Sequence, residues 1–263
     1  MDKWTTDYLQ SWQADFGNEP DAPHSLQFLE DLLSELKGLA HTQSAETTDS
    51  SSETVALSII EAIKSRKNPE GALIDFQAVL FEAAISSPLD PSDLTEVTRL
   101  LVNCLPSPFR EELKYQICVN IRERWNGPDK PSPGKEIDLC IEEWISLNTF
   151  VAYLTRAHAV SLEDYALRTF NRAFDSETYL EHERIYHVPA AAAWISILGT
   201  DIYLWSSQNA GSNGSTGFTW PKWDKWKQGF EISSKSDKLS CQTKKKAEMA
   251  LYKMRELETA ALS

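Results

Sequence analysis

Sequence motifs with a known chemical mechanism are missing from this chain of 263 residues. There is no nucleophile elbow, no phosphate-binding loop, no dinucleotide fingerprint and no paired-aspartate metal motif. These absences argue against elbow hydrolases, P-loop nucleotidases, dinucleotide-dependent dehydrogenases and metal-dependent terpene cyclases. The sequence predicts no cofactor.

Cysteines and long apolar runs are also scarce. The four cysteines, Cys104, Cys118, Cys140 and Cys241, are 14, 22 and 101 positions apart, which matches no zinc or redox pattern and predicts free thiols. The start, Met1–Trp4, lacks the features of a secretion signal, and no stretch approaches the ~20 apolar residues that cross a bilayer. We therefore expect a cytoplasmic protein, with the nucleus as the alternative location, and no membrane partner.

Basic residues are few in the N-terminal part. Residues 1–100 hold 18 acidic and 6 basic side chains, whereas residues 219–263 hold 6 acidic and 10 basic ones. A phosphate backbone requires a basic face, so nucleic acid is not expected as a partner. Within the basic tail, Lys244, Lys245 and Lys246 form either a solvated helix face or a contact to an anion or to the acidic N-terminal part.

Apolar side chains recur at helical spacing almost from end to end, and only 10 glycines interrupt them. This pattern predicts an all-α protein: a compact bundle of about ten to eleven helices without significant β-sheet, forming a single domain over residues 1–263. Three segments lack the pattern. We expect a polar mobile loop at 41–53, a candidate sub-domain break at 126–134, and a flexible loop at 207–217.

Pro189 divides the most apolar region. Its ring removes a hydrogen bond and clashes with the preceding turn, so we expect a helix ending near His187, a break or kink, and a second segment from Ala190 to about Trp205. The small residues at 190–193, followed by Gly199, would let this segment approach a neighbour closely. The central helix of the fold is expected here.

One polar cluster beside this kink could support chemistry. His182 and His187 are five positions apart and point about 140° away from each other on a helix, which excludes a metal pair. Glu183 and His187 are four apart and could touch, so that the carboxylate orients the imidazole for acid or base work. We take His182, Glu183 and His187 as candidate catalytic residues; an ordinary surface pair is the alternative.

A pocket at the kink would have aromatic walls. The candidate ligand-binding residues are Tyr186, Trp194, Tyr203 and Trp205, with His182 or His187 as the polar group that orients a ligand. The alternative is that these aromatic side chains only fill the core.

The C-terminal pattern resembles a known family. The landmarks are Ala191–Ile195, Gly199, Ile202, Tyr203, Phe218, Trp220, Trp223, Trp226 and Met254. They are similar to helical ascomycete proteins catalogued only as a domain of unknown function, over roughly residues 130–262. Lys222 departs from the pattern, which would have arginine. The resemblance implies a fungal source, a helical fold and a loose association with specialised metabolism, but no catalytic residue, because the family has no established activity.

Two functions remain open. The first is a non-enzymatic interaction or accessory protein that binds a protein partner. The second is a cofactor-free enzyme of cyclase or isomerase type that binds a small apolar molecule near Pro189. A closed core around Trp194 would favour the first, and an apolar pocket of several hundred Å³ with His182, Glu183 or His187 on its wall would favour the second.

Overall fold

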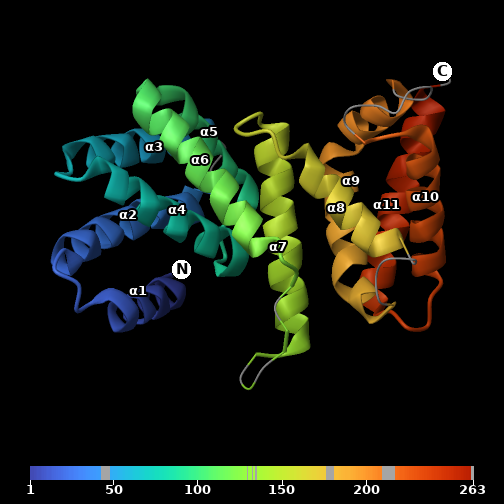
Figure 1. Cartoon of the computed structure of the whole chain (residues 1–263), viewed down its shortest axis with the longest axis horizontal. Coiled ribbons are helices and arrows are strands. Elements are labelled where there is room, and N and C mark those ends of the chain that lie inside the picture. Colours follow the sequence, from blue (N-terminus) through green and yellow to red (C-terminus); the bar gives the residue numbers. More distant parts are fainter. Residues whose placement is uncertain are drawn as a thin grey trace. The chain divides into compact units, whose positions relative to one another are not determined.

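The computed structural model describes residues 1–42, 48–128, 130, 131, 133, 135–175, 181–208 and 217–261. These residues form eleven α-helices and one short 3-10 helix, and none of them forms a β-strand (Figure 1). The helices are α1 (Asp2–Phe16), α2 (Ala22–Thr42), α3 (Thr48–Ser65), α4 (Pro69–Ser86), α5 (Pro91–Cys104), α6 (Ser107–Arg124), α7 (Ile137–Arg156), α8 (Glu163–Phe174), η1 (Glu181–Glu183), α9 (Arg184–Gln208), α10 (Trp220–Ser234) and α11 (Cys241–Ala260). The prediction of an all-α protein is confirmed.

The helices group into two compact units. Unit 1 comprises Met1–Asn126 and Ala157–Val160, and unit 2 comprises Gly127–Arg156 and Ser161–Ser263. The chain first passes from unit 1 to unit 2 at the start of the break predicted at 126–134. That all 263 residues form one domain stays a prediction.

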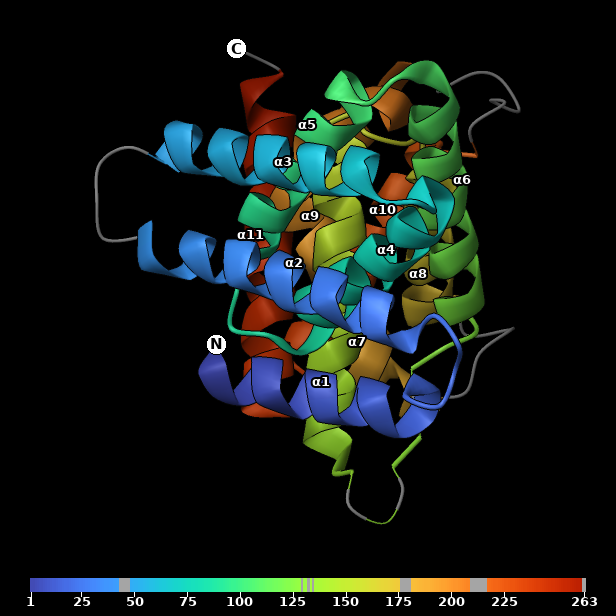
Figure 2. The ribbon, with the colours of Figure 1, turned by 90° about the vertical axis from the view of Figure 1, so that its left-hand side faces the viewer.

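Unit 1 is built around α4. This helix is apolar on most of its circumference, and its side chains Leu73, Phe76 and Phe81 are fully buried. It packs against α2 and α6, while α3 lies beside both α2 and α5 (Figure 2). A helix that is apolar on all sides must be surrounded, so α4 occupies the centre of unit 1.

Local sequence signals start the helices of unit 1. The side chain of Asn68 accepts a hydrogen bond from the backbone N–H of Gly71 at 3.1 Å, and that of Asp90 accepts one from the N–H of Ser92 at 2.8 Å. Each of these caps is followed by a proline at the first helical position, where no helical N–H bond is lost.

Helix extends into both ends of the segment predicted as a mobile loop at 41–53. Helix α2 continues to Thr42 and α3 begins at Thr48, while residues 43–47 lie outside the described part of the chain. Serine, threonine and aspartate make the sequence at 48–53 polar. The same residues favour the start of a helix, and the loop prediction overlooked this. Ser52 in this helix is buried.

Unit 2 is built around α9. This helix packs against α7, α8, α10 and α11, and thirteen of its residues are buried. Gly199 lies against α11, where an added Cβ would be 3.3 Å from Cδ1 of Leu257. The expectation of a central helix that approaches a neighbour closely is confirmed.

The predicted break at Pro189 is wrong. Helix α9 runs without interruption from Arg184 to Gln208, with Pro189 inside it, and η1 precedes it. Pro189 lies in the second turn, so only the bond that its N–H would give to Ile185 is missing, and the packed surroundings of α9 tolerate this loss. Residues 176–180, where the preceding helix was predicted to begin, lie outside the described residues.

Helix α9 is also the one described helix long and apolar enough to cross a membrane, although the sequence analysis had found no such stretch. Its most apolar 18-residue window is 56% buried inside the structure, which is typical of the core helix of a helical protein. The predicted loop at 207–217 also begins later, because α9 includes Ser207 and Gln208; residues 209–216 are not among the described ones.

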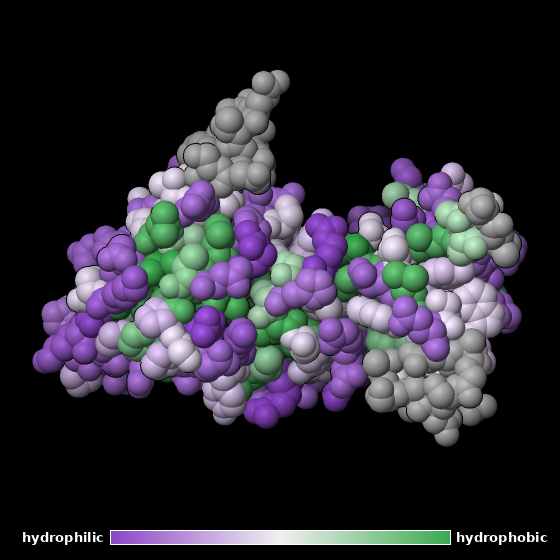
Figure 3. Space-filling model, turned by 90° about the horizontal axis from the view of Figure 1, so that it is seen from above, coloured by the Kyte–Doolittle hydropathy of each residue, from purple (hydrophilic) through white to green (hydrophobic). Residues whose placement is uncertain are grey.

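Some large apolar side chains remain exposed in both units. They include Phe16, Leu57 and Ile74 in unit 1, and Ile232, Met249 and Tyr252 in unit 2. On the face shown in Figure 3, hydrophobic residues lie between hydrophilic ones. Single exposed apolar residues are normal in proteins, so only those that border a cavity together bear on function.

Candidate functional site

The three predicted catalytic residues do not form one site. His182 lies in η1 and is exposed, Glu183 is half-buried, and His187 in the first turn of α9 is 1% exposed. The change from 3-10 helix to α-helix after Glu183 alters the spacing that would bring Glu183 and His187 together. No hydrogen bond or ion pair joins these two side chains in the described part of the chain.

His187 is a core residue. Its ring packs edge-on against the indole of Trp144, with centroids 5.6 Å apart, and its Nδ1 atom has no hydrogen-bond partner. Burial, with a smaller contribution from the positive charge of Arg172, lowers the pKa of His187 from 6.5 to about 3. The imidazole is therefore neutral at pH 7. The spacing of His187 in the sequence gives no sign of this buried position.

Trp194 belongs to a closed polar network inside unit 2. Its indole Nε1 donates to Oδ1 of Asn148 at 2.9 Å, and the hydroxyl of Thr169 donates to the same oxygen at 2.9 Å. The amide nitrogen of Asn148 donates in turn to the carbonyl of Trp144 at 2.8 Å. Trp194 is fully buried and its polar atom is already bonded, and it lines neither of the two cavities described below.

Of the other predicted ligand-binding aromatics, Tyr203 and Trp205 are half-buried and Tyr186 is buried. Tyr203 meets the rings of Trp220 and Trp223 at 5.7 and 5.3 Å, and Trp205 meets Phe218 at 5.1 Å. Tyr186 is buried, and its burial raises the pKa of its hydroxyl, with a smaller contribution from Cys140. The role of these aromatics in ligand binding stays a prediction.

One of the seven predicted residues does border a cavity. His182 lines a hollow of about 300 Å³ together with Arg184, Ile185, Ser236, Lys238 and Leu239. Glu183, His187 and the four aromatics line neither this hollow nor the larger groove of unit 2. That the seven residues form a ligand site stays a prediction.

The larger cavity is an open groove bounded by α7, α9 and α11, with a volume of about 970 Å³. Its floor is the face of α9 that carries Pro189, Ala192, Ala193, Ser196 and Ile197. One wall is a stripe of α7 (Ile145, Thr149 and Tyr153), and the other is the face of α11 from Gln242 to Glu256. We call this feature the α7/α9/α11 groove.

The α9 face forms a hollow because the side chains of this floor are small. Ala192, Ala193 and Ser196 face the groove, whereas Ala190 and Ala191 are completely buried on the other sides of α9. The alanine run thus serves two purposes: it allows close packing on one side and leaves a hollow on the other. The alanine run predicted only a close approach to a neighbouring helix, although the same alanines also form the floor of the groove.

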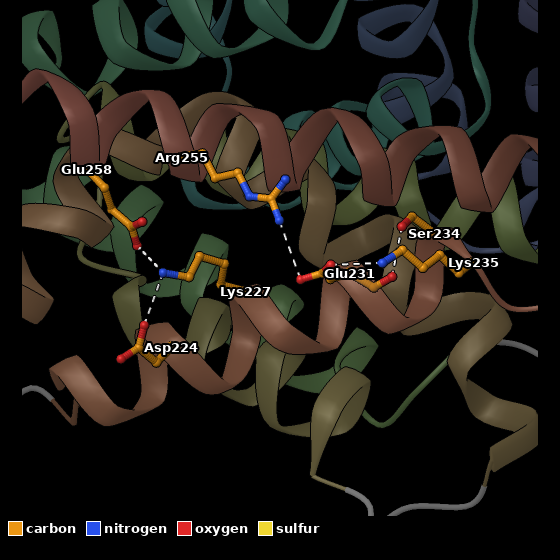
Figure 4. Close-up of polar contacts among 7 residues, drawn as sticks. All are labelled: Asp224, Lys227, Glu231, Ser234, Lys235, Arg255 and Glu258. Carbon is orange, nitrogen blue, oxygen red and sulfur yellow. Dashed lines mark hydrogen bonds and ion pairs between the residues drawn. The ribbon is translucent and has the colours of Figure 1, made fainter.

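Helix α11 has two differently charged sides. On the side toward α10, Lys227 Nζ lies 2.6 Å from Glu258 and 3.1 Å from Asp224, and Glu231 lies 3.4 Å from Arg255 and 2.8 Å from Lys235 (Figure 4). Glu258 also accepts a hydrogen bond from the indole of Trp223 at 2.7 Å. This side is a seam of paired charges. Lys245, Lys246 and Lys253 line the groove instead.

The described residues contain no group of three or more His, Cys, Asp or Glu side chains placed to hold a metal ion. Lys245, Met249 and Tyr252 are exposed on the wall of the groove. The groove is therefore suited to an occupant with an apolar surface, and charged side chains such as Lys245 border its α11 wall.

Comparison with curated proteins found no match, and comparison with solved structures found none either. A family model, described as "Protein of unknown function (DUF3632)", matches residues 31–230. The match begins about a hundred residues before the resemblance seen in the sequence and ends before α11, so it includes α7 and α9 but not the lysine-bearing wall of the groove. Because the match covers more than half of the chain, this protein belongs to the DUF3632 family of proteins of unknown function.

Proposed function

We propose that this protein is a non-enzymatic interaction protein, and that the α7/α9/α11 groove binds an amphipathic helix of a protein partner. The observation that carries the proposal is the groove itself: an open, mainly apolar trough of about 970 Å³ within unit 2. A cytoplasmic location and a fungal source, expected from the sequence, belong to the same proposal.

The dimensions of the groove favour a helical occupant. Its α11 wall runs from Gln242 to Glu256, which is about 21 Å at a rise of 1.5 Å per residue. This is the length of about four helical turns, and a helix lying in such a trough would bury one apolar stripe while its other side stays in water. Met249 supplies a flexible, polarisable contact of the kind common in helix-binding grooves.

The competing proposal is a small-molecule enzyme of cyclase or isomerase type. A volume near 970 Å³ and the presence of Pro189 in the floor favour it, because small-molecule sites have similar volumes. Two observations argue against it. The candidate catalytic residues His182, Glu183 and His187 do not line the groove, and Trp194 is fully buried in the core. The first proposal is therefore the better supported.

Selection of helical peptides from a library tests the proposal. Peptides would be selected on the purified full chain, and their affinities measured by calorimetry for the wild type and for Ser196→Trp. Ser196 is exposed on the floor, so the indole would fill the groove without disturbing the core. We expect at least a tenfold loss of affinity.

The matched control is Gln228→Trp, which adds the same side chain to an exposed position of α10 outside the groove. It should leave the affinity unchanged. Selected peptides that bind Ser196→Trp as well as they bind the wild type would refute the proposal, and so would a selection that enriches no helical peptide.

A further inference from the structure

We infer that the partner helix is acidic where it meets α11, with carboxylates that lie against Lys245 and Lys246. This inference rests on the proposed function, because it concerns the occupant of the same groove. The observation that supports it is the difference in charge between the two sides of α11.

On the α10 side of α11, the charged groups already have partners. Glu258 lies 2.6 Å from the ammonium group of Lys227, and Arg255 lies 3.4 Å from Glu231 (Figure 4). These groups are committed to holding α10 and α11 together. A partner that docked on this side would have to break them.

On the groove side, three lysines form no ion pair with any described residue: Lys245, Lys246 and Lys253. Two carboxylates, Glu248 and Glu256, line the same wall. Glu256 accepts a hydrogen bond from the hydroxyl of Tyr252, which raises the pKa of that tyrosine. The wall therefore carries more positive than negative charge.

The positive charge is concentrated at one end of the wall. Lys245 and Lys246 lie in the first turns of α11, which begins at Cys241, so the partial positive charge of the helix N-terminus adds to theirs. Glu248 follows within one turn and offsets one of these two charges, whereas Lys253 and Glu256 offset each other at the opposite end. An occupant complementary to this wall carries its carboxylates at the Lys245 and Lys246 end.

Between these ends the groove offers apolar contact. Met249 and Tyr252 are 63% and 64% exposed on the α11 wall, and Ile145 and Tyr153 face them from α7. An extended apolar strip beside a cationic end matches the two faces of an amphipathic helix rich in glutamate. It matches a long-chain carboxylate less well, because an open trough leaves one side of an alkyl chain in water.

Three synthetic 16-residue peptides test the inference. They share one apolar stripe of leucine and alanine and differ only on the polar face, which carries glutamate, glutamine or lysine. At 50 mM NaCl we expect the glutamate peptide to bind the wild type about tenfold more tightly than the glutamine peptide, and the lysine peptide to bind most weakly. The preference should shrink at 500 mM NaCl, because salt screens exposed charges.

The double variant Lys245→Glu/Lys246→Glu should abolish the preference for glutamate. The matched control is Lys225→Glu/Lys235→Glu, which changes the net charge equally at two exposed lysines of α10 outside the groove. This control should keep the preference, which separates a local effect from the overall charge of the protein.

The outcomes separate the inference from the proposed function. Equal binding of the glutamate and glutamine peptides, with both lost in Ser196→Trp, would overturn the inference and leave the proposed function standing. Failure of all three peptides and of library-selected helices would overturn both. Saturable binding of dodecanoate that Ser196→Trp abolishes, without binding of any peptide, would show a lipid-like ligand and would also overturn the inference.

Discussion

The cores of the two units are built from different kinds of side chain. The core of unit 1 is largely aliphatic and phenylalanine-based, around Phe76 and Phe81, whereas unit 2 buries Trp194, Trp223 and Trp226 completely. Large rings fill space in a few directions and need small residues beside them, and the alanines of α9 provide these. The comparison teaches that an aromatic core supported by alanine can leave a groove on the surface of the same helix.

The largest effects should come from truncating the central side chain of each unit. Phe76→Ala in unit 1 and Trp194→Ala in unit 2 should each lower the free energy of unfolding by about 3–5 kcal/mol. Trp194→Ala should be the more costly, because Oδ1 of Asn148 also loses the indole N–H. Urea denaturation followed by circular dichroism measures both.

Trp194→Phe separates the two contributions, since it keeps a ring and removes only the hydrogen bond. It should cost about 1–3 kcal/mol. If Trp194→Ala proved no more costly than an ordinary surface substitution, the description of Trp194 as the closed centre of unit 2 would be wrong.

A glycine in each unit offers a matched pair of smaller changes. A Cβ added at Gly229 in α10 would lie 2.3 Å from Cδ1 of Phe174, so Gly229→Ala should destabilise unit 2 by about 3 kcal/mol through overpacking. Gly38 in α2 has no atom within 4 Å of such a Cβ, so Gly38→Ala should stabilise unit 1 by up to about 1 kcal/mol. Thermal unfolding would show melting temperatures that move in opposite directions.

Acid should affect the units differently through their histidines. The pKa of His187 is lowered from 6.5 to about 3 in the folded state, so the unfolded chain binds a proton first as the pH falls. The stabilisation is complete above pH 6.5 and is lost progressively between pH 6.5 and about 3, by about 2 kcal/mol at pH 5. In unit 1, by contrast, His24 and His158 are exposed rather than buried.

Comparison of the wild type with His187→Phe isolates this contribution. The difference in unfolding free energy between the two proteins should change with pH below 6.5 and be constant above it. The exposed His182 serves as the control, because His182→Phe should leave the pH dependence unchanged. A His187→Phe variant with the same acid sensitivity as the wild type would contradict the burial of the imidazole.

The smallest difference is expected between ion pairs of similar geometry. Arg124 and Glu82 in unit 1 lie 2.8 Å apart, and Lys227 and Glu258 in unit 2 lie 2.6 Å apart, all partly exposed. Double-mutant cycles should give each pair at most about 1 kcal/mol, decreasing with added salt. A much larger value for Lys227 and Glu258 would mean that the seam between α10 and α11 contributes more to unit 2 than its rings do.

Much of the fold was predictable from local patterns. Apolar spacing predicted the helices, and Asn68 with Pro69 or Asp90 with Pro91 marks helix starts that the structure has. The continuity of α9 through Pro189 was not predictable in the same way. A proline in the second turn of α9 costs one hydrogen bond, and the packing of four other helices around α9 outweighs that cost.

The candidate site was less predictable than the fold. His187 and Glu183 have the spacing of a touching pair, but the helix type changes between them and burial places the imidazole against Trp144. The groove was not predicted because it combines residues from α7, α9 and α11. Some of the residues from α7 and α11 are more than a hundred positions apart in the sequence. No short stretch of the sequence contains all the residues that form it.

The sequence by itself determined the helical class, the positions of most helices, the apolar face of each and the basic character of the last one, because these depend on side chains within a few turns of each other. Only the tertiary structure decided which alanines of α9 are covered and which form the floor of the groove, which histidine is buried, and which charged side chains of α11 already have an ion-pair partner. Those properties depend on neighbours that are distant in the chain, and they become defined only when the helices pack.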